Sequence, residues 1–404
     1  MAVTETKTTG FLGNLMNSIL AIPIGILLFL ASFVVLFMNE GRTDWSKVGE
    51  RAVELAATDT AGTGALVSVT GPLSTTETLG DSPYLQAGSY LVLEREAEMF
   101  AWIEDSSTET TNNTGGSTTT RTTYTYRTDW TDSPENSSNF REGGHDNPPM
   151  GVTSQSYSAV NGTVGIWPFT TAEATMPGAS DLAVDASMLA PGLAGAQIVS
   201  GFVYLNGADP NSPDVGDIRI SWNALAPGGT VTAFGQAAGG RLVTAETSEG
   251  RWFRILNGDR PTALSSLRTE YVAMGWILRV VGFLMMWFGM SMVFAPLHAI
   301  AGILPFLKKG TTFLINLITF PIALVLTTIT VVISMILNNW IAMVVVALLF
   351  GGIVALLFTM RKKGSDTPAP MGMPPGPPPG MPFGPPPGPP PGAPPGMPPG
   401  PPPA

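Results

Sequence analysis

Two histidines are the residues best suited to acid–base chemistry in this 404-residue chain, which contains no cysteine. His145 lies in the stretch GGHDNPP, where Asp146 could orient its imidazole. His298 lies near the end of a long apolar stretch, where an ionisable group can indicate a function. Catalysis would also require a nucleophile or further metal ligands at set spacings, and the sequence has neither a nucleophile elbow nor an HExxH motif. We predict no catalytic residue, and a membrane-anchored hydrolase or metal-binding protein is kept only as an alternative.

Acidic residues form two clusters that could hold a cation. The aspartates of Asp209–Asp217 are interrupted by prolines and do not have the spacing of a calcium loop. Glu94, Glu96 and Glu98 alternate with apolar residues, which is typical of the solvated face of a strand. No glycine-rich phosphate loop follows a strand, so we predict no metal site and no cofactor. The net charge of −10 argues against nucleic acid as a partner.

The charges are distributed very unevenly along the chain. Residues 40–278 hold 13 basic and 28 acidic residues, whereas the rest of the chain holds 7 basic and 2 acidic residues. The weakly charged parts contain uncharged apolar stretches that are long enough to cross a bilayer, which needs about 20 residues per helix. The sequence therefore predicts an integral membrane protein with one large acidic domain in water.

We expect four transmembrane helices, with the domain inserted between the first and the second. The expected segments are an N-terminal segment (1–10), helix one (11–39), the domain (40–278), helix two (279–303), a basic loop (304–311), helix three (312–336), a tight turn (337–340), helix four (341–360) and a tail (361–404). Basic residues flank the helices at Lys308, Lys309, Arg361, Lys362 and Lys363. Because short basic loops stay in the cytoplasm, both termini are expected there and the acidic domain on the other side.

The inserted domain has the patterns of an α+β domain that is rich in strands. Residues 91–103 alternate apolar and acidic side chains, with Arg95 as the one exception. A Thr- and Asn-rich hairpin tip and a returning strand at 120–130 follow, and short runs between 216 and 258 are separated by glycines. We therefore expect a sheet meander, with a short helix within 170–200.

The tail is a separate low-complexity segment. Residues 368–404 hold 21 of the 37 prolines, with a glycine at every fourth position from Gly372 to Gly400. Collagen needs glycine at every third position, so this pattern indicates a disordered, polyproline-like segment. It could be a spacer or bind a cytoplasmic protein partner.

Small and polar residues on the apolar helices are candidates for helix packing: Gly275, Gly282, Gly289, Asn316, Ala347, Gly351 and Ala355. Such faces could pack the helices of one chain or join two chains. Aromatic and basic residues are candidates for the membrane interface: Trp252, Phe253, Trp276, Arg279, and the five basic residues that flank the helices. Because no charge lies near the centre of a predicted span, an ion channel or transporter subunit is the less favoured alternative.

Seven short motifs carry a resemblance to the LUMA (transmembrane protein 43) family. In chain order they are NEGR at 39–42, LVSVTGPL at 66–73, EMFAWIED at 98–105, TYTYRTDW at 123–130, NFREGGHDNP at 139–148, PDVGDIRISW at 213–222 and WILR at 276–279. The chain is identified as a member of this family over residues 11 to about 360, and its composition is typical of a prokaryotic homologue. The Pro/Gly tail is not part of the family pattern.

The resemblance implies a multi-pass membrane protein that self-associates and organises membrane complexes. In animals the family lies in the endoplasmic reticulum and the inner nuclear membrane, near emerin and lamins. A prokaryotic member is expected in the cell (inner) membrane. We therefore predict a non-enzymatic scaffold that associates with the lipid bilayer and with further copies of itself to organise protein complexes or lipid domains.

Overall fold

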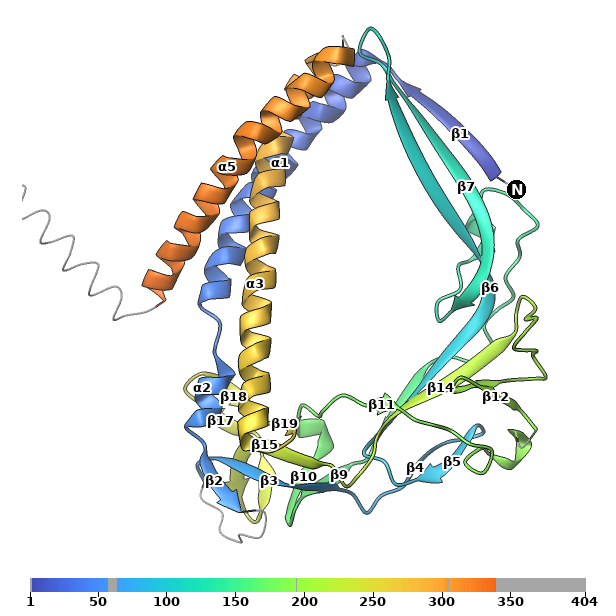
Figure 1. Ribbon diagram of the computed structural model, residues 1–404, viewed down its shortest axis with the longest axis vertical. Coiled ribbons are helices and arrows are strands. Elements are labelled where there is room, and N and C mark those ends of the chain that lie inside the picture. Colours follow the sequence, from blue (N-terminus) through green and yellow to red (C-terminus); the bar gives the residue numbers. More distant parts are fainter. Residues whose placement is uncertain (1, 57–63, 194, 302, 304, 339–404) are drawn as a thin grey trace, which may run out of the picture. The chain divides into compact units, whose positions relative to one another are not determined.

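The computed structural model describes residues 2–338 except 57–63, 194, 302 and 304, and Figure 1 shows its elements. Within these residues the chain combines long apolar helices with a large β-rich region, in agreement with the predicted α+β membrane architecture. The expected fourth helix at 341–360 and the Pro/Gly tail lie outside the described residues.

Three long helices contact one another side by side (Figure 1). They are α1 (Phe11–Glu40), α3 (Arg260–Val293) and α5 (Pro305–Leu337), and the short helices are α2 (Trp45–Glu50) and α4 (Ala295–Ala301). Each long helix contains a stretch that is long and apolar enough to cross a membrane. Three boundaries differ from those expected. Helix two was expected to extend to 303, but α3 ends at Val293 and the short helix α4 follows it. Helix α3 begins inside the expected domain, where Asp259 caps it by accepting from the backbone of Thr262, and α5 begins at Pro305 and includes most of the expected basic loop.

The larger sheet has the strand order β1-β7-β6-β14-β13-β12, with β11 on β14 and β8 on β6. Its strands are β1 (Ala2–Thr9), β6 (Val92–Asn112), β7 (Thr118–Thr131), β8 (Gln155–Ser158), β11 (Ser180–Asp181), β12 (Gln197–Val199), β13 (Phe202–Tyr204) and β14 (Ile218–Leu225). β6, β7 and β14 correspond to predicted strands. The helix expected within 170–200 is replaced by two short 3-10 turns, Thr171–Glu173 and Pro191–Leu193.

The second sheet has the strand order β10-β9-β3-β15-β16, with β19 on β15 and β2 parallel to β3. Its strands are β2 (Val53–Ala56), β3 (Leu66–Ser74), β9 (Asn161–Val164), β10 (Trp167–Thr170), β15 (Thr230–Ala238), β16 (Arg241–Val243) and β19 (Arg254–Asn257). Two small hairpins complete the region, β4 (Leu79–Asp81) with β5 (Leu85–Gly88) and β17 (Ala245–Thr247) with β18 (Gly250–Trp252). A third 3-10 turn spans Ser137–Asn139. The meander expected between 216 and 258 is thus divided among the larger sheet, the second sheet and the β17–β18 hairpin.

The first half of β6 shows why the alternating sequence forms a sheet with one dry face. Leu93, Ala97 and Met99 are fully buried, while the glutamates between them lie on the other face. Arg95 also points inward, where its side chain donates to Asp81 over 2.6 Å. Asp81 is completely buried and also accepts from Tyr157 and Trp222, so every oxygen of this carboxylate is hydrogen-bonded.

The second half of β6 leaves this core and forms a polar ribbon with β7 and β1. β14 and β8 pair with β6 only up to Met99, whereas β7 pairs with it as far as Asn112. Asp105–Thr111 are all exposed. β1 pairs with the outer edge of β7 and forms the end of the sheet. We call β1 together with residues 103–131 of the β6–β7 hairpin the polar ribbon.

Candidate functional site

A group of polar side chains links the end of α1 to α3 where the apolar stretches meet the β-rich region. Its members are Asn39, Glu40, Arg42 and Asp44 on one side and Arg268, Tyr271, Gly275 and Arg279 of α3 on the other. We call this group the boundary cluster. The α3 members follow one another at intervals of three or four residues, which places them on a single helix face.

Glu40 and Arg279 form a two-point contact within the cluster. The Nε and one Nη of Arg279 donate to the two carboxylate oxygens of Glu40 over 2.8 and 2.9 Å. The Glu40 side chain is only 7 % exposed and that of Arg279 is 29 % exposed. A two-point guanidinium–carboxylate pair fixes both distance and angle, so it sets the relative position of α1 and α3 at this depth.

Asn39 and Arg42 bind backbone carbonyls of α3. Asn39 donates to the carbonyl of Gly275 over 3.2 Å, and Arg42 donates to the carbonyl of Tyr271 over 2.9 Å. Arg42 also donates to the Asn39 side chain and lies 4.9 Å above the Tyr271 ring. A Cβ at Gly275 would lie 3.3 Å from one nitrogen of the Arg42 guanidinium, so the Arg42 side chain packs closely against this glycine.

Asp44 extends the cluster towards the β-rich region. Its carboxylate accepts from Arg268 and also caps α2 by accepting from the backbone and hydroxyl of Ser46. One carboxylate therefore joins the start of α2 to the middle of α3 and fixes the turn that follows α1.

The three glycines spaced by seven residues on α3 face α1 of the same chain. A Cβ on Gly282 would lie 2.5 Å from the Leu36 side chain, and a Cβ on Gly289 would lie 2.7 Å from the backbone nitrogen of Phe29. Gly25 of α1 meets Gly289 in the same close approach. Small residues thus allow the two backbones to approach closely, which is how helices associate in lipid.

Helix α5 contacts α3 through the polar residue Thr319, which was not among the predicted packing residues. Asn316 is exposed, whereas Thr319 is buried and accepts from the indole of Trp287 on α3 over 3.2 Å. Thr327 is also buried and donates to the sulfur of Met286. Asparagine is the more polar residue, but its position on the helix turns it away from α3. The four-residue spacing of Thr319, Ala323 and Thr327, which are small or hydroxyl-bearing, would have been the better signal in the sequence.

The predicted interfacial residues occupy different environments. Trp276 is 61 % exposed next to Arg279, whereas Trp252 and Phe253 are 6 % and 4 % exposed and lie in the core of the β-rich region. Trp252 is stacked between Trp45 and Phe234, so β18 turns it inward against the start of α2. Trp252 and Phe253 therefore pack the domain and do not face a lipid surface.

Several predicted positions have no described side chains. Lys308 and Lys309 lie in the first turns of α5. The remaining ones lie outside the described residues: Ala347, Gly351, Ala355, Arg361, Lys362 and Lys363.

The candidate chemical residues serve local structure. His145 is stacked on Tyr126 with ring centroids 4.0 Å apart and meets the edge of Trp102. Asp209 and Asp217 accept from backbone amides within their own turns. In the part of the chain that the structure describes, no three His, Cys, Asp or Glu side chains are grouped so that they could hold a metal ion. His298 lies in α4, apart from the boundary cluster.

Comparison with known proteins gives a consistent result. The family model described as transmembrane protein 43 matches residues 99–340, which is more than half of the chain. The chain is 27 % identical to transmembrane protein 43 of Mus musculus over 352 residues and 27 % identical to that of Homo sapiens over 358 residues. Each alignment covers 81 % of this chain and 87 % of the relative.

The similarity also extends to an insect protein. The transmembrane protein 43 homolog of Drosophila melanogaster is 25 % identical over 282 residues, covering 66 % of this chain and 74 % of its own length. No solved structure matches. The predicted resemblance is confirmed, and this chain belongs to the transmembrane protein 43 family.

Proposed function

We propose that this protein is a non-enzymatic membrane scaffold that self-associates and organises membrane protein complexes or lipid domains. Its family membership and its three long apolar helices support a membrane role. The proposal includes a fourth helix at 341–360, a cytoplasmic tail that binds a protein partner, and a place in the cell (inner) membrane of a prokaryote, or in the endoplasmic reticulum or inner nuclear membrane of a eukaryote.

The observation that carries self-association is the polar ribbon. Beyond the core, residues 105–111 of β6 are all exposed, and they pair with residues of β7 that are partly buried or exposed. Such strands gain little from burying side chains, so their stability depends on backbone pairing. The edge of β6 that faces away from β7 is open beyond Trp102, and it can accept a further strand.

The register of the hairpin identifies which backbone groups form the open edge of β6. Trp102 exchanges both of its backbone hydrogen bonds with the Asn147 side chain, on the side away from β7. The pairing with β7 continues from Trp102 to Asn112 without a bulge. Because antiparallel strands alternate, the N–H of Thr108 also points away from β7. Thr108 is therefore a position at which a substitution can block the edge without breaking the hairpin.

The first test is the mass of the full chain purified in a mild detergent. The proposal expects particles that contain two or more copies, measured by light scattering with the detergent contribution subtracted. A particle that stays monomeric across the accessible protein concentrations would contradict the scaffold proposal.

The second test uses a matched pair of variants at one position. Thr108→Pro removes the outward N–H and places a ring on the edge, whereas Thr108→Ala keeps the N–H. We expect Thr108→Pro to shift the particle mass towards the monomer and Thr108→Ala to leave it unchanged. Equal masses for the two variants would show that the copies associate through another surface.

A further inference from the structure

A cavity of about 190 Å³ lies beside the boundary cluster. Its walls come from the segment after α1, from β19 and from α3, and the residues that matter here are Arg42, Trp45, Arg254, Glu270, Tyr271 and Met274. Two guanidinium groups and one carboxylate thus share a hollow whose other walls are aromatic and apolar apart from Thr43.

Neither guanidinium is fully used by its protein contacts. Arg42 donates through Nε to Asn39 and through one Nη to the Tyr271 carbonyl, which leaves its second Nη outside both bonds. Arg254 donates through one Nη to Glu270 over 2.7 Å, and the Glu270 side chain is 52 % exposed. Because a half-exposed ion pair of this kind contributes little stability, an anion can replace the carboxylate at Arg254 at small cost.

The cavity lies at the depth of lipid headgroups if α1 and α3 cross the membrane. Arg42 follows the last turn of α1, and Tyr271 precedes the exposed Trp276 and the apolar run that begins at Val280. Trp45 and Met274 give the hollow an apolar side, against which the first carbons of a lipid acyl chain can pack.

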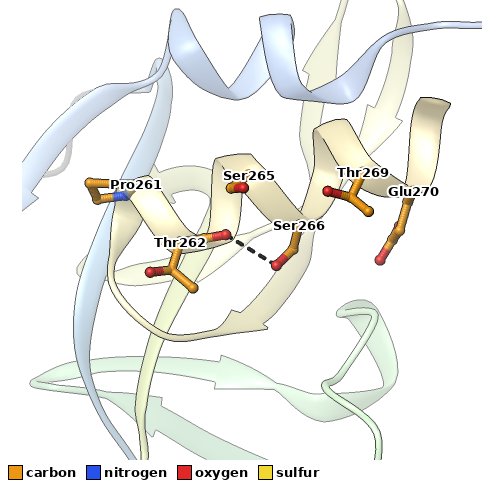
Figure 2. A pocket seen from close by; sticks show the side chains of 6 residues that line it. All are labelled: Pro261, Thr262, Ser265, Ser266, Thr269 and Glu270. Carbon is orange, nitrogen blue, oxygen red and sulfur yellow. Dashed lines mark hydrogen bonds between the residues drawn. The ribbon is translucent and has the colours of Figure 1, made fainter. Parts of the chain in front are cut away.

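A second hollow on the first turns of α3 lacks these features. Figure 2 shows its hydroxyl-bearing side chains and Glu270, and the Ser266 hydroxyl donates to the carbonyl of Thr262. Of the described residues that line it, Glu270 alone carries a charge, and a carboxylate repels an anion. The basic residues therefore distinguish the boundary cavity as the place for a phosphate group.

We propose that the cavity formed by Arg42, Arg254, Tyr271 and Trp45 binds the phosphate group of a membrane phospholipid. This inference rests on the proposed membrane role and names a lipid chemistry that the scaffold would recognise. Arg42 and Arg254 hold the phosphate oxygens, and the acyl chains leave along the apolar side of α3.

The test titrates the full chain in mild detergent with dimyristoyl phosphatidylglycerol and counts bound lipid by native mass spectrometry. Dimyristoylglycerol, which has the same acyl chains without the phosphate, is the lipid control, and inorganic phosphate is the competitor. Since a hydrogen bond to a charged group contributes enough for roughly a tenfold change, we expect Arg254→Gln to weaken phosphatidylglycerol binding at least about tenfold. Arg251→Gln is the matched control, because Arg251 is 74 % exposed and pairs with Glu246 outside the cavity.

Glu270→Gln is expected to change the affinity for phosphatidylglycerol in the opposite direction from Arg254→Gln. This change removes the carboxylate that competes for Arg254, so we expect phosphatidylglycerol to bind several-fold more tightly. Weaker binding of phosphatidylglycerol to Glu270→Gln would show that the Glu270 carboxylate does not compete with the lipid phosphate for Arg254, and it would overturn the assignment. Equal effects of Arg254→Gln and Arg251→Gln, or equal binding of dimyristoylglycerol, would also overturn it.

Competition with inorganic phosphate distinguishes a lipid phosphate group from free phosphate as the ligand of the cavity. Displacement of the lipid by millimolar phosphate would assign the cavity to a free phosphate and contradict a lipid site, whereas retention supports it. Lipid adducts are counted per chain, so the result does not depend on how many copies associate. Failure of the lipid site and failure of the scaffold proposal are therefore separate outcomes.

Discussion

Glu40 is the residue on which the boundary cluster depends most directly. Its nearly buried carboxylate accepts hydrogen bonds from Nε and one Nη of Arg279 and from the Asn39 side chain. A buried ion pair is not necessarily stabilising compared with two apolar residues, but removal of one partner leaves the other charge unpaired. The pair therefore specifies the register of α1 against α3 more than it adds to the free energy of unfolding.

This reasoning predicts a non-additive double-mutant cycle. Arg279→Met leaves the nearly buried Glu40 carboxylate without its partner, so we expect it to lower the free energy of unfolding by roughly 3 kcal/mol. Glu40→Gln leaves the partly exposed Arg279 unpaired and is expected to lower it by less. The double variant should lose clearly less than the sum of the two. The measurement is denaturation in mixed micelles for the four proteins. Additive losses would show that the two side chains act independently.

Glu249 provides a pH dependence in the β-rich region. Its carboxylate accepts from Arg51 and from the Ser248 hydroxyl, and these contacts lower its pKa to about 2 from an ordinary value of 4.5. A lowered pKa in the folded state means that the stabilisation is complete above pH 4.5 and is lost as the pH falls towards 2. Glu249 is exposed, so the effect is expected to be small.

The corresponding prediction compares melting temperatures of the wild type and Glu249→Gln between pH 6 and pH 2. We expect the two curves to be separated by a constant amount above about pH 4.5 and to converge below it, because the wild type gains a proton that the variant cannot bind. A separation that stays constant down to pH 2 would show that the ion pair with Arg51 does not form in solution.

At the scale of elements, the glycines of α3 predict a graded effect of adding one methyl group. A Cβ on Gly282 would meet side-chain atoms of Leu36, which can shift more easily than backbone atoms. A Cβ on Gly289 would lie 2.7 Å from the Phe29 nitrogen and 2.8 Å from the Gly25 carbonyl, and backbone atoms cannot move without separating the helices.

Gly289→Ala is therefore expected to destabilise the packing of α1 on α3 by about 1–3 kcal/mol, and Gly282→Ala by less. Denaturation in mixed micelles measures both. Gly143→Ala is the control, since nothing lies within 4 Å of a Cβ at that position. If Gly282→Ala were the more harmful change, the close approach of the two helices would not be the one described.

The elements that sequence could predict are those that depend on local periodicity. Alternation in residues 91–103 was sufficient for the first half of β6, and the break at Arg95 correctly marked an inward-facing charge. The partner of that charge, Asp81, could not be predicted, because the contact depends on how the preceding β4–β5 hairpin folds back under the sheet. The seven-residue spacing of glycines predicted a shared helix face, but it did not show that this face meets α1 of the same chain.

The packing of aromatic and polar residues was harder to predict for a physical reason. Trp252 next to basic residues resembles an interfacial tryptophan, yet its position on β18 turns it into the core. The boundary cluster joins residues that are more than 220 positions apart. Its sequence motifs could be recognised, but their mutual contact depends on the antiparallel packing of α1 and α3, which local patterns do not encode.

In the whole molecule, the polar ribbon contacts one end of α1 while the boundary cluster lies at the other end, and the two contacts together are difficult to reconcile with a membrane around α1. Asn14, in the first turn of α1, donates to the carbonyl of Gly116 at the ribbon tip, while Asn39, in the last turn, belongs to the boundary cluster. The 30 residues of α1 extend about 45 Å, which exceeds a bilayer core of about 30 Å. If α1 crosses a membrane, the ribbon would have to pass beside it through lipid to reach Asn14.

Such a passage is physically unfavourable, because the exposed threonines and open edges of the ribbon would lose water without gaining partners. We therefore expect the pairing of β1 with β7 of its own chain to be absent in the membrane-inserted protein. The outer edge of β7 is then free for a strand of another copy, and the N-terminal segment lies across the membrane from the β-rich region. The absence of native cysteine makes this expectation directly measurable, since each introduced thiol is unique.

Thr4→Cys and Ser133→Cys, treated in sealed vesicles with a membrane-impermeant maleimide, distinguish the two arrangements. Both side chains belong to exposed residues, one in β1 and one after β7. A spanning α1 predicts that each vesicle orientation labels only one of the two positions, and that detergent makes both reactive. Pairing of β1 with β7 requires both positions to react from the same side, because paired strands cannot be separated by a bilayer. Labelling of both from one side would mean that α1 does not cross the membrane, and the boundary cluster could then not mark the depth of lipid headgroups.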